Sequence, residues 1–280
     1  MFILQTRALL NTEYWTLNTE YSTEMTAAPP LPLTLCLLLT SLAARAQDSY
    51  EIQVYGSETV APGATMAELH SNYTFQGNKN TVNGVLPNYH AFHETIEITH
   101  GFTPWFETGF YIFTSVQPGH GWEWVGDHIR PRVRIPEEWH WPVGLSLSTE
   151  VGYERRSYSE NTWSWEIRPI IDKQWGPWYI SFNPSFEKAL HGPGSSQGFE
   201  FAPSAKLSYD VIPQVAIGVE YYSGLGRVNH FDSFGDQQHQ IFPVIDLNLS
   251  PKWEINFGVG IGLNHSTDHL IAKFILGRRF

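Results

Sequence analysis

The chain has 280 residues, of which 42% are hydrophobic, 16% are charged and 15% are aromatic, and its formal net charge is −11. This apolar content excludes a disordered tail, and the negative charge argues against a nucleic-acid partner, which would select a basic surface. Because the mean hydropathy is −0.25 and no run of about 18 apolar residues occurs, the sequence also excludes a helical membrane protein.

The first part of the chain has the pattern of an export signal. Residues 31–42, LPLTLCLLLTSL, are apolar, and Ala44-Arg45-Ala46 has the small-x-small form of a signal-peptidase site. We therefore interpret residues 25–46 as a signal peptide, and residues 1–24 as an extension from a start codon assigned too early. The only cysteine, Cys36, lies within the apolar run, so the exported chain has no disulfide, thiolate ligand or cysteine nucleophile.

From residue 64 onward, apolar and polar residues alternate with a period of two, which is typical of β-strands with one apolar face. For example, Leu145 and Leu147 share one parity, while Ser146 and Ser148 share the other. Twelve such strands are predicted, at 67–75, 92–99, 106–116, 129–135, 143–154, 163–171, 178–187, 199–209, 215–222, 239–249, 253–263 and 270–280. No segment shows a helical period of 3.6 residues, so the predicted fold class is all-β: a sandwich, a propeller or a barrel.

The predicted connections alternate in length, which favours a membrane barrel with short periplasmic turns and long extracellular loops. Tight turns are expected near 100–104, 136–142, 172–177, 210–214 and 250–252, and longer polar loops near 76–89, 117–127, 189–198 and 224–237, with loops of intermediate length near 155–161 and 264–268.

Tryptophans at both ends of the predicted strands support the same interpretation. Trp105, Trp139, Trp141, Trp175, Trp178 and Trp253 lie beside short turns, and Trp122, Trp124, Trp163 and Trp165 lie beside long loops. Two belts of this kind are typical of the aromatic girdles of an outer-membrane protein. We therefore predict a transmembrane antiparallel up-and-down β-barrel of about 12 strands over residues 64–280, with both termini on the periplasmic side. Residues 47–63 form a periplasmic N-terminal segment that either lines the barrel mouth or partly plugs it.

The chain ends in KFILGRRF, in which Phe274, Leu276 and the terminal Phe280 share one face. This ending resembles the C-terminal signature strand that the barrel-assembly machinery recognises in bacterial outer-membrane proteins. Three stretches are similar to an uncharacterised family of outer-membrane barrels, laid out like the putative transporters grouped with phenol-degradation (MetA-pathway) proteins: EIQVYGSETVAPG at 51–63, HETIEITHGFTPWFETGFY at 93–111 and LNLSPKWEINFGVGIG at 247–262. The resemblance implies a location in the cell outer membrane, with membrane lipid and the assembly machinery as partners. It does not imply phenol as the solute.

With the apolar parity facing lipid, the other parity sends charged side chains of both signs into the lumen. In HIRPRVRI at 128–135, the period places His128, Arg130, Arg132 and Arg134 in one inward column. Antiparallel pairing is expected to place three more charged side chains near this column: Glu150, Glu166 and Arg168. The column is either a salt-bridge ladder that rigidifies the barrel or a rung that selects anionic solutes.

Catalytic and metal-binding patterns are weak. Residues 194–198, GSSQG, match G-x-S-x-G but lie in a predicted loop, and no histidine has the serine two residues later that barrel lipases need. A group of acidic and histidine residues in the outer loops is interpreted as solvated polarity: His230, Asp232, Asp236, Asp268 and His269. His90, His93 and Glu94 resemble a fragment of a metal motif. On a strand, however, His93 and Glu94 face opposite sides, so no third ligand is evident. We therefore expect no enzyme activity, no cofactor and no metal.

The function expected from these features is a narrow passive channel or transporter for small solutes whose identity the sequence does not name. Two alternatives remain, namely a non-transporting structural or adhesive barrel and, third, a barrel hydrolase acting on lipid or peptide.

Overall fold

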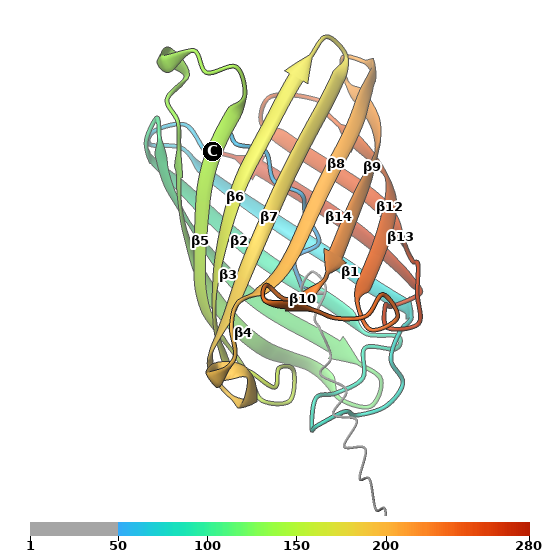
Figure 1. Ribbon diagram of the computed structural model, residues 1–280. Helices are drawn as coiled ribbons and strands as arrows, with labels where there is room; N and C mark the ends of the chain where they lie inside the picture. The colour runs from blue at the N-terminus through green and yellow to red at the C-terminus, as the bar shows by residue number, and fades with distance from the viewer. Residues whose placement is uncertain (1–49) are drawn as a thin grey trace, which may run out of the picture. The chain divides into compact units, whose positions relative to one another are not determined.

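The computed structural model describes residues 50–280, so the predicted extension at 1–24, the predicted signal peptide at 25–46 and residues 47–49 lie outside the described residues. The described chain forms a single antiparallel sheet of fourteen strands. Two of them, β10 (Gly226–Arg227) and β11 (His230–Phe231), have two residues each and form a small hairpin within a loop. The other twelve strands build the closed barrel in Figure 1. They are β1 (Thr65–Gln76), β2 (Phe92–Thr103), β3 (Phe106–Gln117), β4 (Gly121–Arg134), β5 (Gly144–Glu154), β6 (Trp163–Trp175), β7 (Trp178–His191), β8 (Glu200–Ile212), β9 (Val215–Gly224), β12 (Gln238–Leu247), β13 (Trp253–Gly262) and β14 (Leu270–Arg279).

The sheet closes where the last strand meets the first. β14 pairs with β1 in antiparallel register, and the chain continues around the barrel through β13, β12, β9 and β8 without a gap. The backbone of the terminal Phe280 is hydrogen-bonded to Thr65, with Phe280 N donating to Thr65 O at 2.8 Å. β1 therefore begins at the rim where β14 ends, as an even number of strands requires. The predicted all-β, twelve-stranded antiparallel barrel is confirmed.

The connections differ in length at the two ends of the barrel. At the rim that holds Phe280, for example, residues 104–105, 176–177 and 213–214 each turn the chain with two residues between strands. At the opposite rim, residues 77–91 and 225–237 form long loops. The first rim carries the shortest turns and the second carries the longest loops, but the expected tight turn at 136–142 is part of a longer connection, 135–143, that contains the 3-10 helix Glu137–Trp139 at the first rim.

The prediction of a long loop at 117–127 was wrong. β3 and β4 are joined by residues 118–120 alone, and β4 begins at Gly121 rather than near residue 129. Gly119 and Gly121 both have positive φ, 83° and 69°, which allows a tight reversal where the composition indicates a loop. A register shift between Phe113 and Thr114 accommodates the longer strand.

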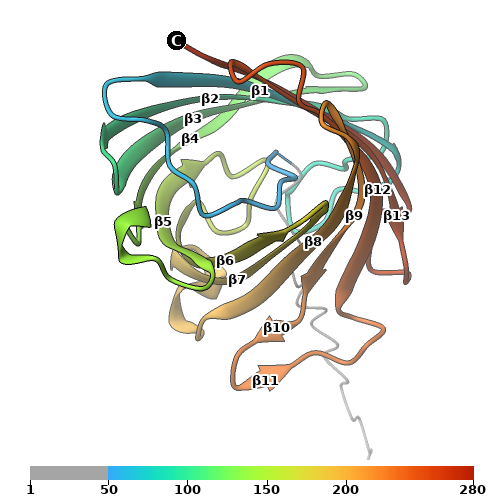
Figure 2. The ribbon, with the colours of Figure 1, turned by 90° about the horizontal axis from the view of Figure 1, so that it is seen from above.

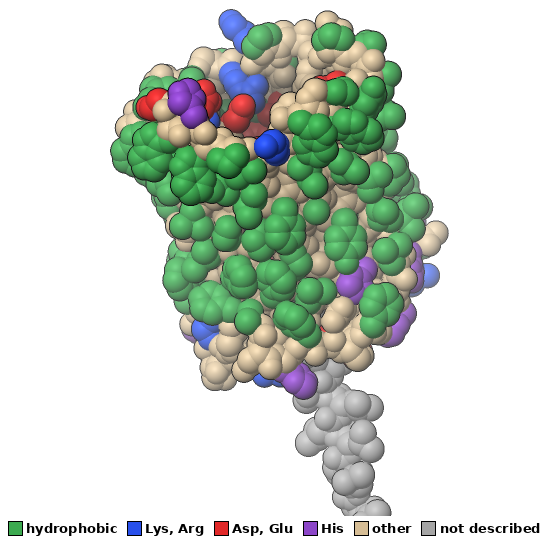
Figure 3. All heavy atoms as spheres, turned by 45° about the horizontal axis from the view of Figure 1, so that its top comes forward, with side chains coloured by type: hydrophobic (Ala, Val, Ile, Leu, Met, Phe, Trp, Pro, Cys, Tyr) green, Lys and Arg blue, Asp and Glu red, His purple; other side chains and the backbone are tan. Residues whose placement is uncertain are grey.

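The outer surface is apolar, and the inner surface is not. β2 shows the alternation clearly: Ile96 and Ile98 are exposed on the outside, while Thr95, Glu97 and Thr99 are buried inside. Figure 3 shows hydrophobic side chains over the outer wall and charged side chains at the opening of the upper rim. Within the described residues, no helix is long and apolar enough to cross a membrane.

The segment before β1 enters the barrel. In Figure 2 the chain from residue 50 runs across the interior of the ring of strands before it reaches β1. Tyr50, Glu51, Ile52, Val54 and Tyr55 are all buried there. The sequence left open whether residues 47–63 line the barrel mouth or partly plug the barrel. The described residues 50–57 lie within the lumen, as a partial plug would.

Candidate functional site

The N-terminal segment is held in the lumen by hydrogen bonds from barrel side chains rather than by strand pairing. Near the long-loop end, Thr95 Oγ1 donates to the carbonyl of Tyr50 at 2.7 Å. Lys273 Nζ donates to the carbonyl of Ile52 at 3.0 Å. Because a buried backbone carbonyl without a partner is costly, these side chains replace the sheet ladder that the segment lacks.

Closer to the short-turn rim, the same pattern continues with groups of the opposite wall. Tyr55 N donates to Asn183 Oδ1 at 2.7 Å, and Tyr55 O accepts from Ser181 Oγ at 2.6 Å. Ser57 donates twice to Asp172, from its backbone N at 2.9 Å and from its Oγ at 2.6 Å. The segment is therefore anchored to both sides of the barrel along its length.

The arginine column lies beside this segment and is paired with carboxylates. Arg130 Nη2 lies 2.5 Å from Glu97 Oε1 and Arg130 Nη1 lies 3.5 Å from Glu107 Oε1. Arg132 Nη2 lies 2.6 Å from the same Glu107 oxygen and also donates to the carbonyl of Glu58 at 2.6 Å. Arg130 and Arg132 thus neutralise acids on β2 and β3. Arg132 also donates hydrogen bonds to the N-terminal segment, and Arg130 lies over the ring of Tyr55 in that segment.

Glu150 lies beside the column, as expected from the sequence, but its partner there is His128 rather than an arginine, and Glu166 and Arg168 pair with each other. Glu150 faces His128, whose Nδ1 lies 2.5 Å from Glu150 Oε1, and Glu166 pairs with Arg168 at 2.8 Å. Arg168 also lies 3.4 Å from Glu51 of the segment. The sequence could not distinguish these pairs from pairs with Arg130, because a strand register is not visible in a period-two pattern.

Arg134 occupies a different environment from the other two arginines. Its Nη2 pairs with Glu137 Oε1 at 2.7 Å, and the Glu137 side chain is 77% exposed. Arg134 therefore lies at the short-turn rim, while Arg130 and Arg132 lie within the barrel.

A second group of charged side chains meets inside the barrel, and the sequence did not predict that its members contact one another. Lys206 Nζ lies 3.3 Å from Glu220 and 2.8 Å from Asp246, and Lys273 also pairs with Glu220. Each of these side chains has the inward parity, which was a usable signal. What the sequence did not contain was their adjacency, since Lys273 on β14 reaches Glu220 on β9 across the barrel interior.

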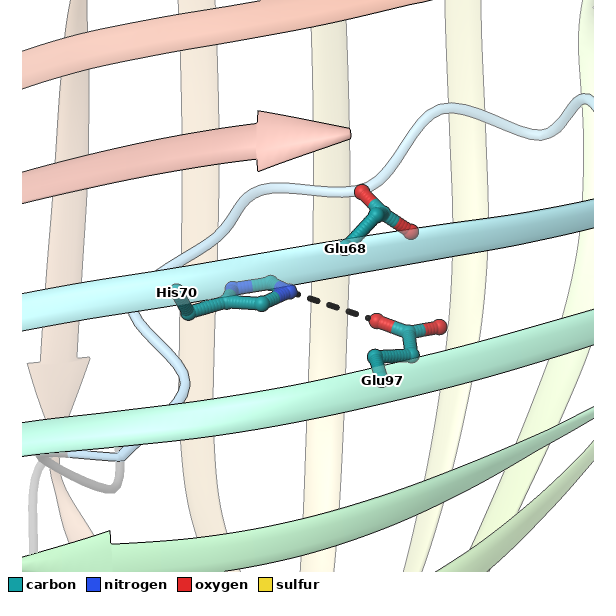
Figure 4. Close-up of side chains that lie close together, drawn as sticks. All are labelled: Glu68, His70 and Glu97. Carbon is teal, nitrogen blue, oxygen red and sulfur yellow. Dashed lines mark ion pairs between the residues drawn. The ribbon is translucent and has the colours of Figure 1, made fainter. Parts of the chain in front are cut away.

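A third group lies in the wall formed by the first two strands. Figure 4 shows Glu68 and His70 on β1 beside Glu97 on β2, with His70 Nε2 3.4 Å from Glu97 Oε2. Ligand atoms of all three residues lie within 4.8 Å of one another. The sequence interpretation expected no metal site and did not group these residues.

The predicted girdle and assembly residues lie on the outside of the barrel. Of the predicted girdle, six tryptophans are exposed: Trp105, Trp139, Trp141, Trp163, Trp178 and Trp253. Trp165 is partly buried and donates from Nε1 to Thr149 Oγ1 at 2.7 Å. Phe274 is exposed on the outer face of β14, which Leu276 shares, and Phe280, the residue after β14, is also exposed.

The G-x-S-x-G match does not form a nucleophile elbow. Pro193–Ser196 forms a short 3-10 helix in the loop between β7 and β8, and Ser195 Oγ donates to the carbonyl of Gly192 at 2.8 Å. A strand-to-helix turn that exposes the hydroxyl is therefore not built here.

Comparisons with known proteins agree with this architecture. Residues 136–273 match the family described as "Putative MetA-pathway of phenol degradation". An outer membrane channel from Pseudomonas putida F1 has the same fold, with a TM-score of 0.55 and 13% identity over 82% of this chain and 100% of that chain. A second solved structure, the KdgM porin, gives a TM-score of 0.49 and 10% identity over 77% of this chain and 99% of that chain. No curated protein sequence matches the chain. The chain is therefore a twelve-stranded β-barrel with the fold of an outer-membrane channel, and its residues 136–273 are similar to the family described as the putative MetA-pathway of phenol degradation.

Proposed function

We propose that this barrel is a narrow passive channel for small solutes in the outer membrane, exported through the signal peptide at 25–46. The observation that carries the proposal is the inner wall, which is charged in both signs and faces a segment that is not part of the sheet. A pore for hydrophilic solutes requires a polar interior of this kind.

The N-terminal segment sets the width of this channel. Residues 50–57 occupy the lumen, yet they are held by side-chain hydrogen bonds and a few ion pairs rather than by a strand ladder. Such an attachment can be released without breaking the sheet. Twelve strands also enclose less space than the sixteen strands of open porins, so a passage beside the segment would be narrow.

A non-transporting barrel is the second candidate, and one observation favours it. The arginines within the barrel are matched by carboxylates, as a structural ladder requires, and the segment adds buried apolar contacts such as Ile52 and Val54 against Phe242. The two candidates differ in whether ions pass through the purified protein.

Conductance in planar bilayers separates the candidates. The exported chain has no cysteine of its own, so Ser57→Cys combined with Asp172→Cys introduces a single pair of thiols, at two positions whose side chains are in contact, with Ser57 Oγ and Asp172 Oδ1 2.6 Å apart. A disulfide there ties the segment to the wall, and reduction frees it. We expect a small conductance in the wild type, a smaller one in the oxidised double variant, and recovery on reduction.

Deletion of residues 50–57 provides the second arm of this experiment. The deletion is expected to raise the conductance while the protein keeps heat-modifiable migration, which reports a closed barrel. If neither the wild type, the reduced double variant nor the folded deletion variant conducts ions, the channel proposal is wrong and the structural role holds.

A further inference from the structure

The first two strands bring three metal-ligating side chains to one place on the inner wall. Glu68 and His70 are two residues apart on β1 and therefore share the inward face. Glu68 is directly opposite Glu97 on β2, and His70 is opposite the neighbouring inward residue Thr95. The three side chains converge in Figure 4.

His70 is buried without the hydrogen bonds that a buried imidazole normally makes. Its side chain is 0% exposed, and neither Nδ1 nor Nε2 has a hydrogen-bond partner among residues 50–280. Nε2 points toward Glu97 Oε2 at 3.4 Å, a separation without hydrogen-bond geometry. A buried polar group that lacks a partner in a native structure requires an explanation, of which a bound ion is one.

Glu97 presents one oxygen to its neighbours and keeps the other for this site. Its Oε1 accepts from Arg130 at 2.5 Å and from Thr99 Oγ1 at 2.6 Å. Its Oε2 has no hydrogen-bond partner among the described residues and faces His70. Arg130 thus fixes the Glu97 carboxylate in a position from which Oε2 can act as a ligand.

Two carboxylates directly opposite each other on neighbouring strands repel, and a cation between them removes the repulsion. One imidazole nitrogen and two carboxylate oxygens are a ligand set that Zn²⁺ and related divalent ions accept, at metal–ligand distances of about 2.0–2.2 Å. The ligand atoms lie within 4.8 Å of one another, so small side-chain rotations bring them to one ion. We propose that Glu68, His70 and Glu97 bind one divalent transition-metal ion of the Zn²⁺ class in the barrel wall.

The site lies at the closure of the barrel. β1 pairs with β14 on its other side, where Glu68 is opposite Gly277 and His70 is opposite Ile275. A bound ion would connect β1 to β2 next to this seam. The metal therefore acts on the stability of the closed barrel, and this role is independent of whether solutes pass.

Zinc binding to the purified full-length barrel in detergent tests the proposal. After treatment with a chelator, Zn²⁺ is titrated by calorimetry and by competition with a chromophoric chelator, and the thermal unfolding midpoint is recorded with and without Zn²⁺. We expect one Zn²⁺ per chain at the site and a higher midpoint with Zn²⁺. His70→Gln and Glu68→Gln are each expected to weaken this binding by more than about tenfold, because each removes one ligand.

His93→Gln is the matched control. His93 is also buried on the inner face of β2 with no hydrogen-bond partner for its ring nitrogens among the described residues, but its ring packs against Tyr50 at 4.6 Å. This variant loses one histidine, as His70→Gln does, and is expected to bind Zn²⁺ like the wild type. Absence of stoichiometric Zn²⁺ binding in the wild type would overturn the proposal, and His70 would then be a buried partner of Glu97 only. Equal binding by the wild type and His70→Gln would overturn it as well, since the ion would then lie on exposed histidines.

Discussion

Arg130 shows how the interior of this barrel tolerates a full charge. Its side chain is 2% exposed and lies close to Glu97, Glu107 and the hydroxyl of Tyr111, to which its Nε donates. Removing one member of a buried ion pair leaves the other charge without compensation, at a cost far above that of an exposed pair. The position of an arginine within the column therefore decides what its replacement does.

Arg130→Gln should lower the free energy of unfolding by about 3–5 kcal/mol, because the buried Glu97 loses its arginine partner, while Glu107 keeps Arg132. Arg134→Gln is the matched control, since its partner Glu137 is exposed and such pairs contribute less than about 1 kcal/mol. Urea unfolding of both variants measures the difference. Equal stability of the two variants would contradict the ladder interpretation of Arg130. In the same proteins, a lower anion-to-cation permeability ratio in Arg134→Gln would assign solute selection to the rim.

Among the elements, the long loops contact one another above the barrel. Asp268, in the loop between β13 and β14, accepts a hydrogen bond from Asn88 Nδ2 of the loop between β1 and β2. Burial raises the pKa of the Asp268 carboxyl from 3.8 to about 6, although the hydrogen bonds from Asn78 and Asn88 and the nearby His269 lower it. The folded loops therefore favour the protonated acid relative to the unfolded chain.

The sign of this shift predicts looser loops at higher pH. A raised pKa contributes stability that is complete below pH 3.8 and is lost as the pH rises through about 6. The loop at 77–91 contains Lys79, a site for trypsin. The measured quantity is the rate of cleavage after Lys79 in the wild type divided by the rate in an Asp268→Asn variant. This ratio should be higher at pH 7.5 than at pH 5.5. The variant keeps a neutral side chain at both pH values and corrects for the pH dependence of the protease. A ratio that does not change with pH would show that Asp268 does not control this contact.

For the whole molecule, the decisive element is the last strand. β14 pairs with β13 through nine residue pairs and with β1 through ten, so the ring forms only when the end of the chain is in place. Phe280 contributes backbone hydrogen bonds to Thr65 and an exposed aromatic ring. The aromatic ring of Phe280 is 69% exposed, so it contributes little to packing within the barrel.

Phe280→Ala removes only the aromatic ring and keeps the backbone hydrogen bonds. If the ring is read during assembly, the variant should reduce the amount of heat-modifiable barrel in the outer membrane several-fold without changing synthesis of the chain. Phe102→Ala is a suitable control, since Phe102 is an exposed aromatic residue on β2. Immunoblots of unheated membrane fractions measure both variants. Normal levels of folded Phe280→Ala would show that the terminal aromatic ring is not read during assembly.

The sequence alone determined the fold of this protein, because the membrane imposes a period of two on every strand and an aromatic residue at every interface. Ile96 and Ile98 on the lipid side and Glu97 on the inner side follow from parity without any knowledge of contacts. Strand ends were less certain, since Gly119 and Gly121 indicate a loop by composition while their positive φ allows a tight turn. Parity also placed the charged residues on the inner face, but it contained no information on which ones meet.

Only the tertiary structure decided those pairs. The register between β1 and β2 sets Glu68 opposite Glu97, and the register between β4 and its neighbours gives Arg130 to Glu97 rather than to Glu150. The same holds for the segment at 50–57, whose partners Lys273, Ser181 and Asp172 come from strands far along the chain. A one-residue alternation fixes which face a side chain takes, whereas closure of the ring and its register fix its neighbours, and the chemistry of this lumen depends on the neighbours.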